Sequence, residues 1–241
     1  MKLFGLIGHP LGHSFSKAYF TEKFESKGLD CEYQNFDIKE INTIRKLVSD
    51  HPNLKGFNVT IPYKEAIIPY LDELDPVANK IGAANTVKVL SNGRLKGFNT
   101  DVTGMKASIT MDKSKKALIL GTGGASKAAQ YVLRSESIPF HLVSRDPKKS
   151  DFTYQNLTPE IIQSHLIIVN ATPVGMAPHA NEAPDIPYEA ITPQHMLFDL
   201  IYNPEETLFL QHGRKHGATT VNGLTMLHAQ AEASWMIWNQ P

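Results

Sequence analysis

A glycine-rich loop between an apolar segment and a helical segment is the feature that most limits how this chain can fold. The apolar run Lys116–Leu120 leads into Gly121-Thr122-Gly123-Gly124-Ala125, and helical spacing continues to about Leu133. This order suits dinucleotide binding, because the turn lets backbone N–H groups approach a pyrophosphate at a helix N-terminus. The third glycine comes earlier than in the G-x-G-x-x-G pattern, so a glycine-rich turn without a ligand stays the alternative. The loop residues predicted to contact a cofactor are Gly121, Gly123, Gly124 and Ala125.

The residues after the next predicted strand indicate which dinucleotide is bound. An NAD enzyme places an acidic side chain there, roughly 20 residues beyond the loop, to hold the ribose 2′-hydroxyl. Here the strand 140–143 is followed by Ser144-Arg145-Asp146-Pro147-Lys148-Lys149, whose cationic groups suit a 2′-phosphate. Asp146 either repels that phosphate or pairs with Arg145. We therefore predict NADP as the cofactor, with NAD less favoured, and contacts from Ser144, Arg145 and Lys148.

The first hundred residues predict a separate α/β unit. Short apolar runs alternate there with segments of helical spacing, a pattern typical of a parallel sheet. The predicted strands are 3–7, 31–36 and 54–59, and the predicted helices begin after Ser14 and at Ile38. The segments 86–90 and 95–98 then form a predicted hairpin, because the Asn-Gly pair between them supplies the positive φ angles of a tight turn.

Further strand candidates complete a second α/β unit; they are 140–143, 166–169 and 196–200. The last segment, 224–238, carries apolar residues on one helical face and is expected to fold back onto the first unit. The predicted fold is α/β with two domains and a cleft between them. The N-terminal substrate-binding and catalytic domain comprises 1–101 plus 223–241, and the Rossmann-type NADP-binding domain comprises 102–222.

Composition narrows the class of partner. The 241 residues include 24 Lys and Arg against 24 Asp and Glu, so no general field favours nucleic acid or an anionic membrane. No stretch approaches the roughly 18 apolar residues of a membrane-spanning helix, and Cys31, the single cysteine, excludes an internal disulfide. The prediction is a cytoplasmic protein, monomeric or homodimeric, that binds a small-molecule substrate and no metal.

A lysine and an aspartate precede the glycine loop, each at the end of a short motif. Lys64 closes the segment 58–64, and Asp101 closes the segment 99–101. Reduction of a ketone leaves an alkoxide that must be protonated, and a positioned general acid contributes about 10²–10⁴-fold to the rate. We predict that Lys64 donates and accepts this proton and that Asp101 orients it. The alternative is that Lys64 only anchors a substrate hydroxyl.

Ser14 and Ser16 lie one residue apart where the first predicted strand turns into a helix. Two hydroxyl groups at a helix N-terminus can donate to a carboxylate, which the helix dipole also favours. Serines are ordinary helix N-caps as well, so position alone leaves both interpretations open. His9 and His13 flank this turn without a metal-ligand spacing and are expected to be non-catalytic.

The chain resembles the shikimate dehydrogenase family in a series of motifs that runs from the first strand to the final helix. These motifs are Gly12-His13-Ser14-Phe15-Ser16, Asn58-Val59-Thr60-Ile61-Pro62-Tyr63-Lys64, Gly82-Ala83-Ala84-Asn85-Thr86, Gly97-Phe98-Asn99-Thr100-Asp101, Asn170-Ala171-Thr172-Pro173-Val174-Gly175-Met176, Asp199-Leu200-Ile201-Tyr202-Asn203-Pro204 and Asn222-Gly223-Leu224 through Gln230. A match of several motifs in order is more specific than any one of them.

The resemblance implies reversible, NADP-dependent reduction of 3-dehydroshikimate to shikimate, in the shikimate pathway of aromatic amino-acid biosynthesis, with Lys64 and Asp101 as the catalytic pair. It implies that Ser14 and Ser16 bind the substrate carboxylate. The other substrate residues that it implies are Thr60, Asn85, Tyr202 and Gln230, and the further cofactor residues are Thr172, Met176 and Gly223. The family often has Asn-Arg-Thr where this chain has Ser144-Arg145-Asp146, which bears on the strictness of NADP preference and not on the reaction.

Three other interpretations share part of this pattern. A quinate or aminoshikimate dehydrogenase using NAD would keep the Lys–Asp pair and differ in its pocket contacts. A non-catalytic ligand-sensing homologue would need no proton donor, whereas Lys64 and Asp101 are both present. A dehydrogenase of the methylene-tetrahydrofolate type is less well matched, because Ser14 and Ser16 suit a carboxylated ring better than a folate.

Overall fold

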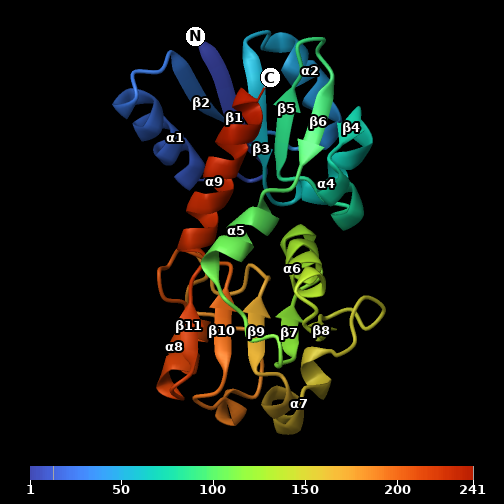
Figure 1. The fold of residues 1–241 in the computed structure, drawn as a ribbon, viewed down its shortest axis with the longest axis vertical. Coiled ribbons are helices and arrows are strands. Elements are labelled where there is room, and N and C mark those ends of the chain that lie inside the picture. Colours follow the sequence, from blue (N-terminus) through green and yellow to red (C-terminus); the bar gives the residue numbers. More distant parts are fainter. Residues whose placement is uncertain (13, 241) are drawn as a thin grey trace. The chain divides into compact units, whose positions relative to one another are not determined.

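The computed structural model describes residues 1–12 and 14–240, so His13 lies outside the described part. The chain forms two compact units, Met1–Thr100 with Ala231–Pro241 and Asp101–Gln230. Each unit contains its own β-sheet flanked by helices (Figure 1). The predicted α/β class is therefore confirmed.

The first unit is built on a six-stranded mixed sheet in the order β2-β1-β3-β5-β6-β4. Its strands are β1 (Lys2–Gly8), β2 (Cys31–Asp37), β3 (Leu54–Val59), β4 (Glu73–Leu74), β5 (Thr86–Val89) and β6 (Leu95–Phe98). β1 runs parallel to β2 and β3, whereas β5 is antiparallel to both β3 and β6. The start of β5 therefore lies at the same edge of the sheet as the ends of β1, β3 and β6.

Helices cover both faces of this sheet. Consecutive residues of β1 point to opposite faces, and both sets are buried because each face is covered. On one side, aromatic residues of α1 (Phe15–Ser26) and of the end of α9 (Leu224–Asn239) pack with Phe4. On the other side, α2 (Ile44–Asp50) and α3 (Tyr63–Ala66) pack with Leu3, and α4 (Pro76–Ile81) contacts β6. The helix predicted from Ile38 begins later, since a 3₁₀ turn at Ile41–Thr43 precedes α2.

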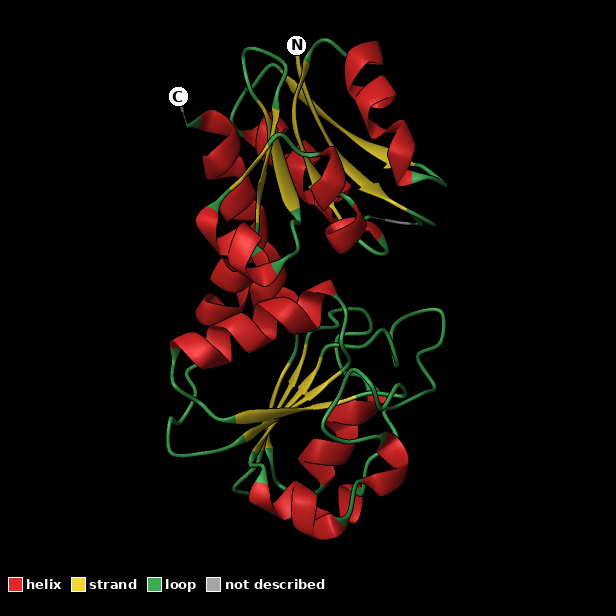
Figure 2. Ribbon diagram, turned by 90° about the vertical axis from the view of Figure 1, so that its right-hand side faces the viewer, coloured by secondary structure: helices red, strands yellow, loops and turns green. Residues whose placement is uncertain are grey.

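The second unit is built on a five-stranded, fully parallel sheet in the order β11-β10-β9-β7-β8. Its strands are β7 (Ala117–Leu120), β8 (Phe140–Val143), β9 (Ile167–Asn170), β10 (Met196–Asp199) and β11 (Thr219–Val221), and its helices α5 (Asp101–Ser108), α6 (Gly124–Ser135), α7 (Pro159–Ser164) and α8 (Leu208–Lys215). Figure 2 shows helices on both sides of these strands. This covering explains why β7 and β9 are buried along their whole length and read as unbroken apolar runs.

The order of these strands fixes where a ligand can bind. β8 lies on one side of β7 and β9 on the other, so the direction in which the sheet grows reverses at β7. Open parallel sheets bind ligands beyond the carboxyl ends of their strands at such a switch point. None of the helices in residues 1–12 and 14–240 combines the length and the apolarity needed to cross a bilayer.

Candidate functional site

In the first unit, the candidate substrate residues lie at one edge of the sheet. Ser14 and Ser16 follow β1, Thr60 and Lys64 follow β3, and Asn85 directly precedes β5. These strand ends are neighbours, because β3 pairs with the last residues of β1 and with the first residue of β5. Five candidates from three separate segments are thus brought together within this unit.

Backbone contacts fasten the segments that carry Thr60, Lys64 and Asn85. The Thr60 N–H donates to the carbonyl of Ile7 (2.9 Å), and the Ala84 N–H donates to the carbonyl of Lys64 (2.8 Å). A Cβ added at Gly8 would lie 2.5 Å from Cγ2 of Thr60, so the end of β1 passes this loop at a distance that excludes any side chain. The backbone of the partly exposed Lys64 is therefore held in place next to Asn85.

Ser14 and Ser16 differ in their surroundings. Ser14 is the N-cap of α1, and its Oγ accepts a hydrogen bond from the N–H of Lys17 (3.3 Å). A capping serine uses a lone pair of its oxygen, so its hydroxyl proton remains a donor for a ligand. Ser16 is buried near Tyr33, and burial raises the pKa of the Tyr33 phenol. The helix-cap interpretation thus holds for Ser14 without excluding a role in anion binding.

A buried hydrogen-bond network lies behind this edge of the sheet. The Tyr33 hydroxyl donates to Oδ1 of Asn58 (2.9 Å), and Nδ2 of Asn58 donates to Ser234 of α9 (2.9 Å) and to Thr86 (3.1 Å). The hydroxyl oxygens of Thr86 and Ser234 are hydrogen-bonded to each other at 2.8 Å. Side chains from β2, β3, β5 and α9 are joined in this way, and the side chain of Asn58 is used entirely within the network.

The orientation of Asn85 follows from the neighbouring segment. Oδ1 of Asn85 accepts from the backbone N–H (2.7 Å) and the hydroxyl (3.1 Å) of Thr100. The amide NH₂ of Asn85 is consequently on the side of its side chain that faces away from Thr100. Asn99 is anchored through Nδ2 to the carbonyl of Ala83 (3.0 Å), as expected for a residue that holds its segment in place.

In the second unit, the candidate cofactor residues follow the carboxyl ends of successive strands. After β7 come Gly121 to Gly123 of the loop and Gly124 and Ala125 at the start of α6. The loops after β8, β9, β10 and β11 carry, respectively, Ser144 to Lys148, Thr172 and Met176, Tyr202, and Gly223. The switch point between β7 and β9 brings the glycine loop next to Thr172. A Cβ added at Gly121 would lie 3.0 Å from Cγ2 of Thr172 and from the carbonyl oxygen of Ala171.

The glycine loop has the properties that a pyrophosphate requires. Gly121 has φ 103°, a conformation that favours glycine. A Cβ added at Gly123 would meet no atom of the described residues within 4 Å, so there is open space in front of α6. Gly123 is the N-cap of that helix and has no side chain with which to cap it. These residues therefore fit the phosphates of a dinucleotide.

The turn after β8 exposes cationic side chains, and its single carboxylate interacts with other residues of the same turn. Oδ1 of Asp146 accepts from the N–H of Lys148 (3.0 Å), and Oδ2 lies 3.9 Å from Nζ of Lys149. The partner of Asp146 is thus Lys149 and not Arg145, the partner considered from the sequence. Arg145 and Lys148 are exposed, whereas Ser144 is buried and its Oγ accepts from the N–H of Asp146 (2.9 Å). The Ser144 hydroxyl thereby stabilises the turn.

The remaining candidates of this unit lie on α5, α9 and the loop after β10. Asp101 is the buried first residue of α5, and Gln230 is buried on α9 with Nε2 donating to the carbonyl of Leu227 (3.1 Å). A Cβ added at Gly104 would lie 3.3 Å from Cβ of Gln230, so the helices that carry the two residues pack closely within the unit. Tyr202 is partly buried, and this burial raises its pKa.

Gly223 and Met176 occupy contrasting environments. A Cβ added at Gly223 would lie 2.3 Å from the carbonyl oxygen of Leu200, and the Gly223 N–H donates to the carbonyl of Ile201 (2.9 Å). Glycine is required here by packing of the backbone. Met176, by contrast, is 39% exposed, which leaves it accessible to a ligand.

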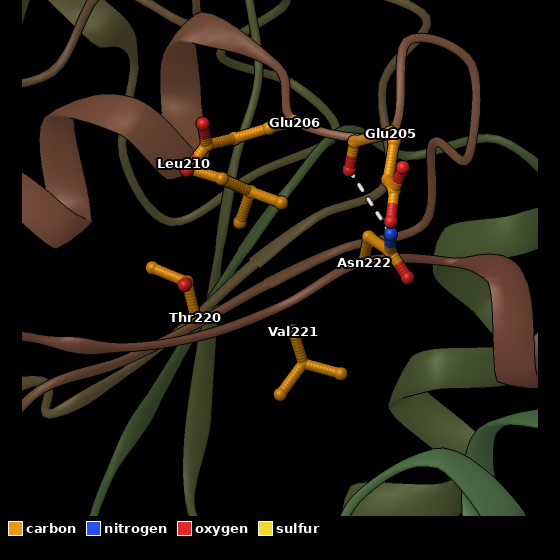
Figure 3. A pocket seen from close by; sticks show the side chains of 6 residues that line it. All are labelled: Glu205, Glu206, Leu210, Thr220, Val221 and Asn222. Carbon is orange, nitrogen blue, oxygen red and sulfur yellow. Dashed lines mark hydrogen bonds between the residues drawn. The ribbon is translucent and has the colours of Figure 1, made fainter.

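A surface hollow, drawn from close by in Figure 3, lies beside the loop that follows Tyr202, and its volume is about 590 Å³. It is lined by Glu205, Glu206, Leu210, Thr220, Val221 and Asn222. Nδ2 of Asn222 donates to the carbonyl of Glu205 (3.0 Å) and closes one side. The hollow contains none of the candidate residues, and its two carboxylates oppose a phosphate-bearing ligand.

Several polar residues that lie behind these sites were not identified from the sequence. They are Tyr33, Thr86, Ser234, Asn170, Asp199 and Thr207, all buried. A partial signal exists for two of them, because Asn170 and Asp199 are polar residues that close apolar strands. Tyr33, Thr86 and Ser234 carry no such mark, since their partners are distant in the sequence, whereas Thr207 lies only eight residues from its partner Asp199.

Comparison with known proteins gives matches to the sequence and to the structure. A family model described as the shikimate dehydrogenase substrate-binding domain matches residues 6–87. An NADP(+) shikimate dehydrogenase of Methanococcus maripaludis is 40% identical over 258 residues, covering 98% of this chain and 91% of the relative.

Solved structures give the same family and one different activity. The shikimate 5-dehydrogenase of Thermus thermophilus, in complex with NADP(H) and shikimate, is 31% identical with a TM-score of 0.88, covering 99% of this chain and 94% of that one. The ligand-free 5-ketofructose reductase of a Gluconobacter species is 30% identical with a TM-score of 0.83, covering 99% and 92%. The likeness extends in each case over nearly the whole chain.

Proposed function

The chain belongs to the shikimate dehydrogenase family, and on that premise we propose that it catalyses the reversible, NADP-dependent reduction of 3-dehydroshikimate to shikimate. The family, the oxidoreductase class and NADP as the cofactor agree with the predictions from the sequence and are confirmed. The observation that carries the proposal is the clustering of Ser14, Ser16, Thr60, Lys64 and Asn85 at one edge of the first sheet. Those residue types suit a ring that bears a carboxylate and several hydroxyls.

The substrate end of the mechanism draws on Ser14, Ser16, Thr60, Lys64 and Asn85 of the first unit and on Asp101, Tyr202 and Gln230 of the second. Ser14 and Ser16 hold the carboxylate at the N-terminus of α1, where the helix dipole adds a favourable contribution of about 0.3–1 kcal/mol. Thr60 and the NH₂ group of Asn85 bind ring hydroxyls, and Tyr202 and Gln230 supply further contacts to the substrate. Lys64 moves the proton at the oxygen of the reacting hydroxyl, and Asp101 orients the lysine.

The cofactor end belongs to the second unit. NADP, when bound, supplies or accepts the hydride. The glycine loop Gly121 to Ala125 holds its pyrophosphate, and Arg145 with Lys148 holds the 2′-phosphate beyond the Ser144 turn. Thr172, Met176 and Gly223 line the remaining part of the cofactor. Oxidation of shikimate balances when its carbon loses a hydride and its hydroxyl oxygen loses a proton through Lys64.

The first test is the initial rate of NADP⁺ reduction by shikimate with the purified protein, followed at the absorbance of the reduced nicotinamide. We expect shikimate-dependent reduction of NADP⁺. Quinate with NAD⁺ tests the related dehydrogenase, and fructose with NADP⁺ tests the activity of the Gluconobacter relative. Folded protein without turnover of any of these substrates would favour the ligand-sensing interpretation.

Lys64→Ala separates proton transfer from simple anchoring of the substrate. Because the substitution removes the general acid and base, we expect kcat to fall by about 10²–10⁴-fold with little change in KM. Lys55→Ala is the matched control, since Lys55 is an exposed lysine of β3 outside the candidate set. An increase in KM with unchanged kcat would contradict the acid/base role.

Further features of the protein are proposed on the same premise. We assign substrate binding to 1–101 plus 223–241 and NADP binding to 102–222. The partner is a small-molecule substrate, and the protein acts as a monomer or homodimer. A cytoplasmic location is supported by a single cysteine and a cofactor of central metabolism.

A further inference from the structure

A buried carboxylate in the second unit has no part in the steps above. Asp199 is the last residue of β10, and its side chain has no exposed surface. Asn170, the last residue of β9, pairs with it across the sheet and is buried to the same extent. An ionised carboxylate in such a place is costly unless hydrogen bonds compensate for the lost water.

Three donors converge on this carboxylate. The Thr207 hydroxyl donates to Oδ2 (2.5 Å), and the Ile201 N–H donates to Oδ1 (3.1 Å). Nδ2 of Asn170 also donates to Oδ1 (3.1 Å). Ile201 directly precedes Tyr202, and Thr207 is the N-cap of α8. The carboxylate therefore holds both ends of the loop that carries Tyr202.

Asn170 extends the same network into the loop after β9. Because its Nδ2 is directed at Asp199 and at the carbonyl of Val174 (3.3 Å), its Oδ1 faces Thr172. That oxygen accepts from the N–H (3.1 Å) and from the hydroxyl (2.6 Å) of Thr172. A threonine hydroxyl has one proton, and here Asn170 receives it. Because its N–H is donated to the same oxygen, Thr172 is presented to a cofactor by its carbonyl and methyl groups.

The two loops are also joined directly. The Ala177 N–H donates to the carbonyl of Asn203 (3.2 Å), beyond Met176 on one loop and beyond Tyr202 on the other. The loop proposed to meet the cofactor and the loop proposed to meet the substrate therefore share one anchor. That anchor is the Asp199–Asn170 pair.

We infer that Asp199 is a positioning residue, which sets the cofactor-facing loop 171–177 through Asn170 and the substrate-facing loop 200–207 through Ile201 and Thr207. The inference rests on the proposed function for the identity of the ligands. An aspartate is suited to this place because it accepts from all three donors at once. An alanine leaves three buried donors without an acceptor, and an asparagine retains an acceptor for two of them.

The test compares Asp199→Ala and Asp199→Asn with a matched control, His195→Ala. His195 is also buried, it lies directly before the opposite end of β10, and it hydrogen-bonds Thr192 (3.0 Å) and Ile162 (3.1 Å). Its loss perturbs the same strand but not the two loops. The dissociation constant of NADP⁺ is measured by calorimetry, together with the melting temperature and with kcat and KM for shikimate.

We expect Asp199→Ala to raise the dissociation constant of NADP⁺ by about tenfold, because the loop must be ordered on binding. Asp199→Asn should recover most of this loss, and His195→Ala should lower the melting temperature without weakening NADP⁺ binding. If Asp199→Ala does not fold, Thr207→Val decides, since it removes one of the three donors and should weaken binding by about threefold.

A folded Asp199→Ala or Thr207→Val protein with wild-type affinity for NADP⁺ would overturn the inference. So would a His195→Ala protein that loses as much affinity as Asp199→Ala, because the effect would then be general destabilisation. Wild-type protein that binds NADP⁺ without oxidising shikimate would refute the proposed reaction and leave this comparison intact.

Discussion

Two glycines of the same loop should respond to alanine in opposite ways. Gly123 has φ −80° and ψ −174°, which alanine adopts without strain, and an added Cβ meets no atom of the described residues within 4 Å. Gly121 has φ 103°, and its added Cβ would lie 3.0 Å from the carbonyl oxygen of Ala171. The free protein should therefore tolerate alanine at position 123 and be destabilised by alanine at position 121.

The magnitudes follow from these environments. Gly121→Ala forces an L-residue into a left-handed conformation, which costs about 1–2 kcal/mol before the contact with Ala171 is counted. For Gly123→Ala, the stabilisation gained by lowering the entropy of the unfolded chain, about 0.4–1 kcal/mol, offsets the loss of a good N-cap residue. The free energy of unfolding should therefore change by less than about 1 kcal/mol.

Gly123→Ala should weaken the binding of NADP⁺, although it leaves the stability of the free protein almost unchanged. A methyl group in the space that the pyrophosphate is to occupy costs about 1–3 kcal/mol, as in other overpacked sites. At about 1.4 kcal/mol per factor of ten, the dissociation constant rises by roughly 5- to 150-fold. Urea unfolding gives the stability of each variant, and calorimetry gives its affinity for NADP⁺.

The result that refutes this reasoning is a Gly123→Ala protein that binds NADP⁺ as tightly as the wild type. The pyrophosphate would then not approach the chain at the start of α6. A large loss of stability in the same variant would show instead that the open space at Gly123 is filled by the protein.

Three further predictions concern charge, packing and pH. Arg145→Ala should raise KM for NADP⁺ and leave KM for NAD⁺ unchanged, since NAD lacks the 2′-phosphate; equal changes for both cofactors would contradict this role. Gly56→Ala should destabilise the protein by about 1–3 kcal/mol in urea unfolding, because its Cβ would lie 2.3 Å from the Trp238 indole; unchanged stability would show that the indole can move. Burial raises the pKa of Asp199 to about 6, so its protonated form stabilises the folded state below about pH 4, and about 3 kcal/mol is lost as the pH rises through 6. Subtracting the pH profile of Asp199→Asn from that of the wild type isolates this slope, and a difference that is flat with pH would refute it.

The parts of the fold that were predictable are those with a local signal. The apolar runs of β1, β3, β7 and β9 and the Asn-Gly hairpin of β5 and β6 lie within a few residues of their predicted bounds. β4 has two residues and β11 has three, which is too short for a hydrophobic period to appear. Both strands exist because a neighbouring strand offers hydrogen bonds, and that is a tertiary property.

The candidate site divides in the same way. The glycine loop, the Arg145 turn and the Ser14, Lys64 and Asp101 motifs are contiguous in sequence, so residue type and spacing were enough to propose them. The pairing of Asp146 with Lys149 was not predictable, because competing partners of similar reach flank the carboxylate. The helix-cap role of Ser14 was likewise one of two alternatives until the backbone was known.

By itself, the sequence determined the α/β class, the family, the cofactor and the chemistry, because each depends on residue types held at short spacing. Tertiary structure decided which polar groups are buried together. Asn58 and Ser234 are 176 positions apart, and Asp199 and Asn170 are 29 apart, yet each pair is joined by a hydrogen bond. Contacts of this kind depend on the order and register of strands, which bring distant residues together and remove water from around them, and no local pattern records either event.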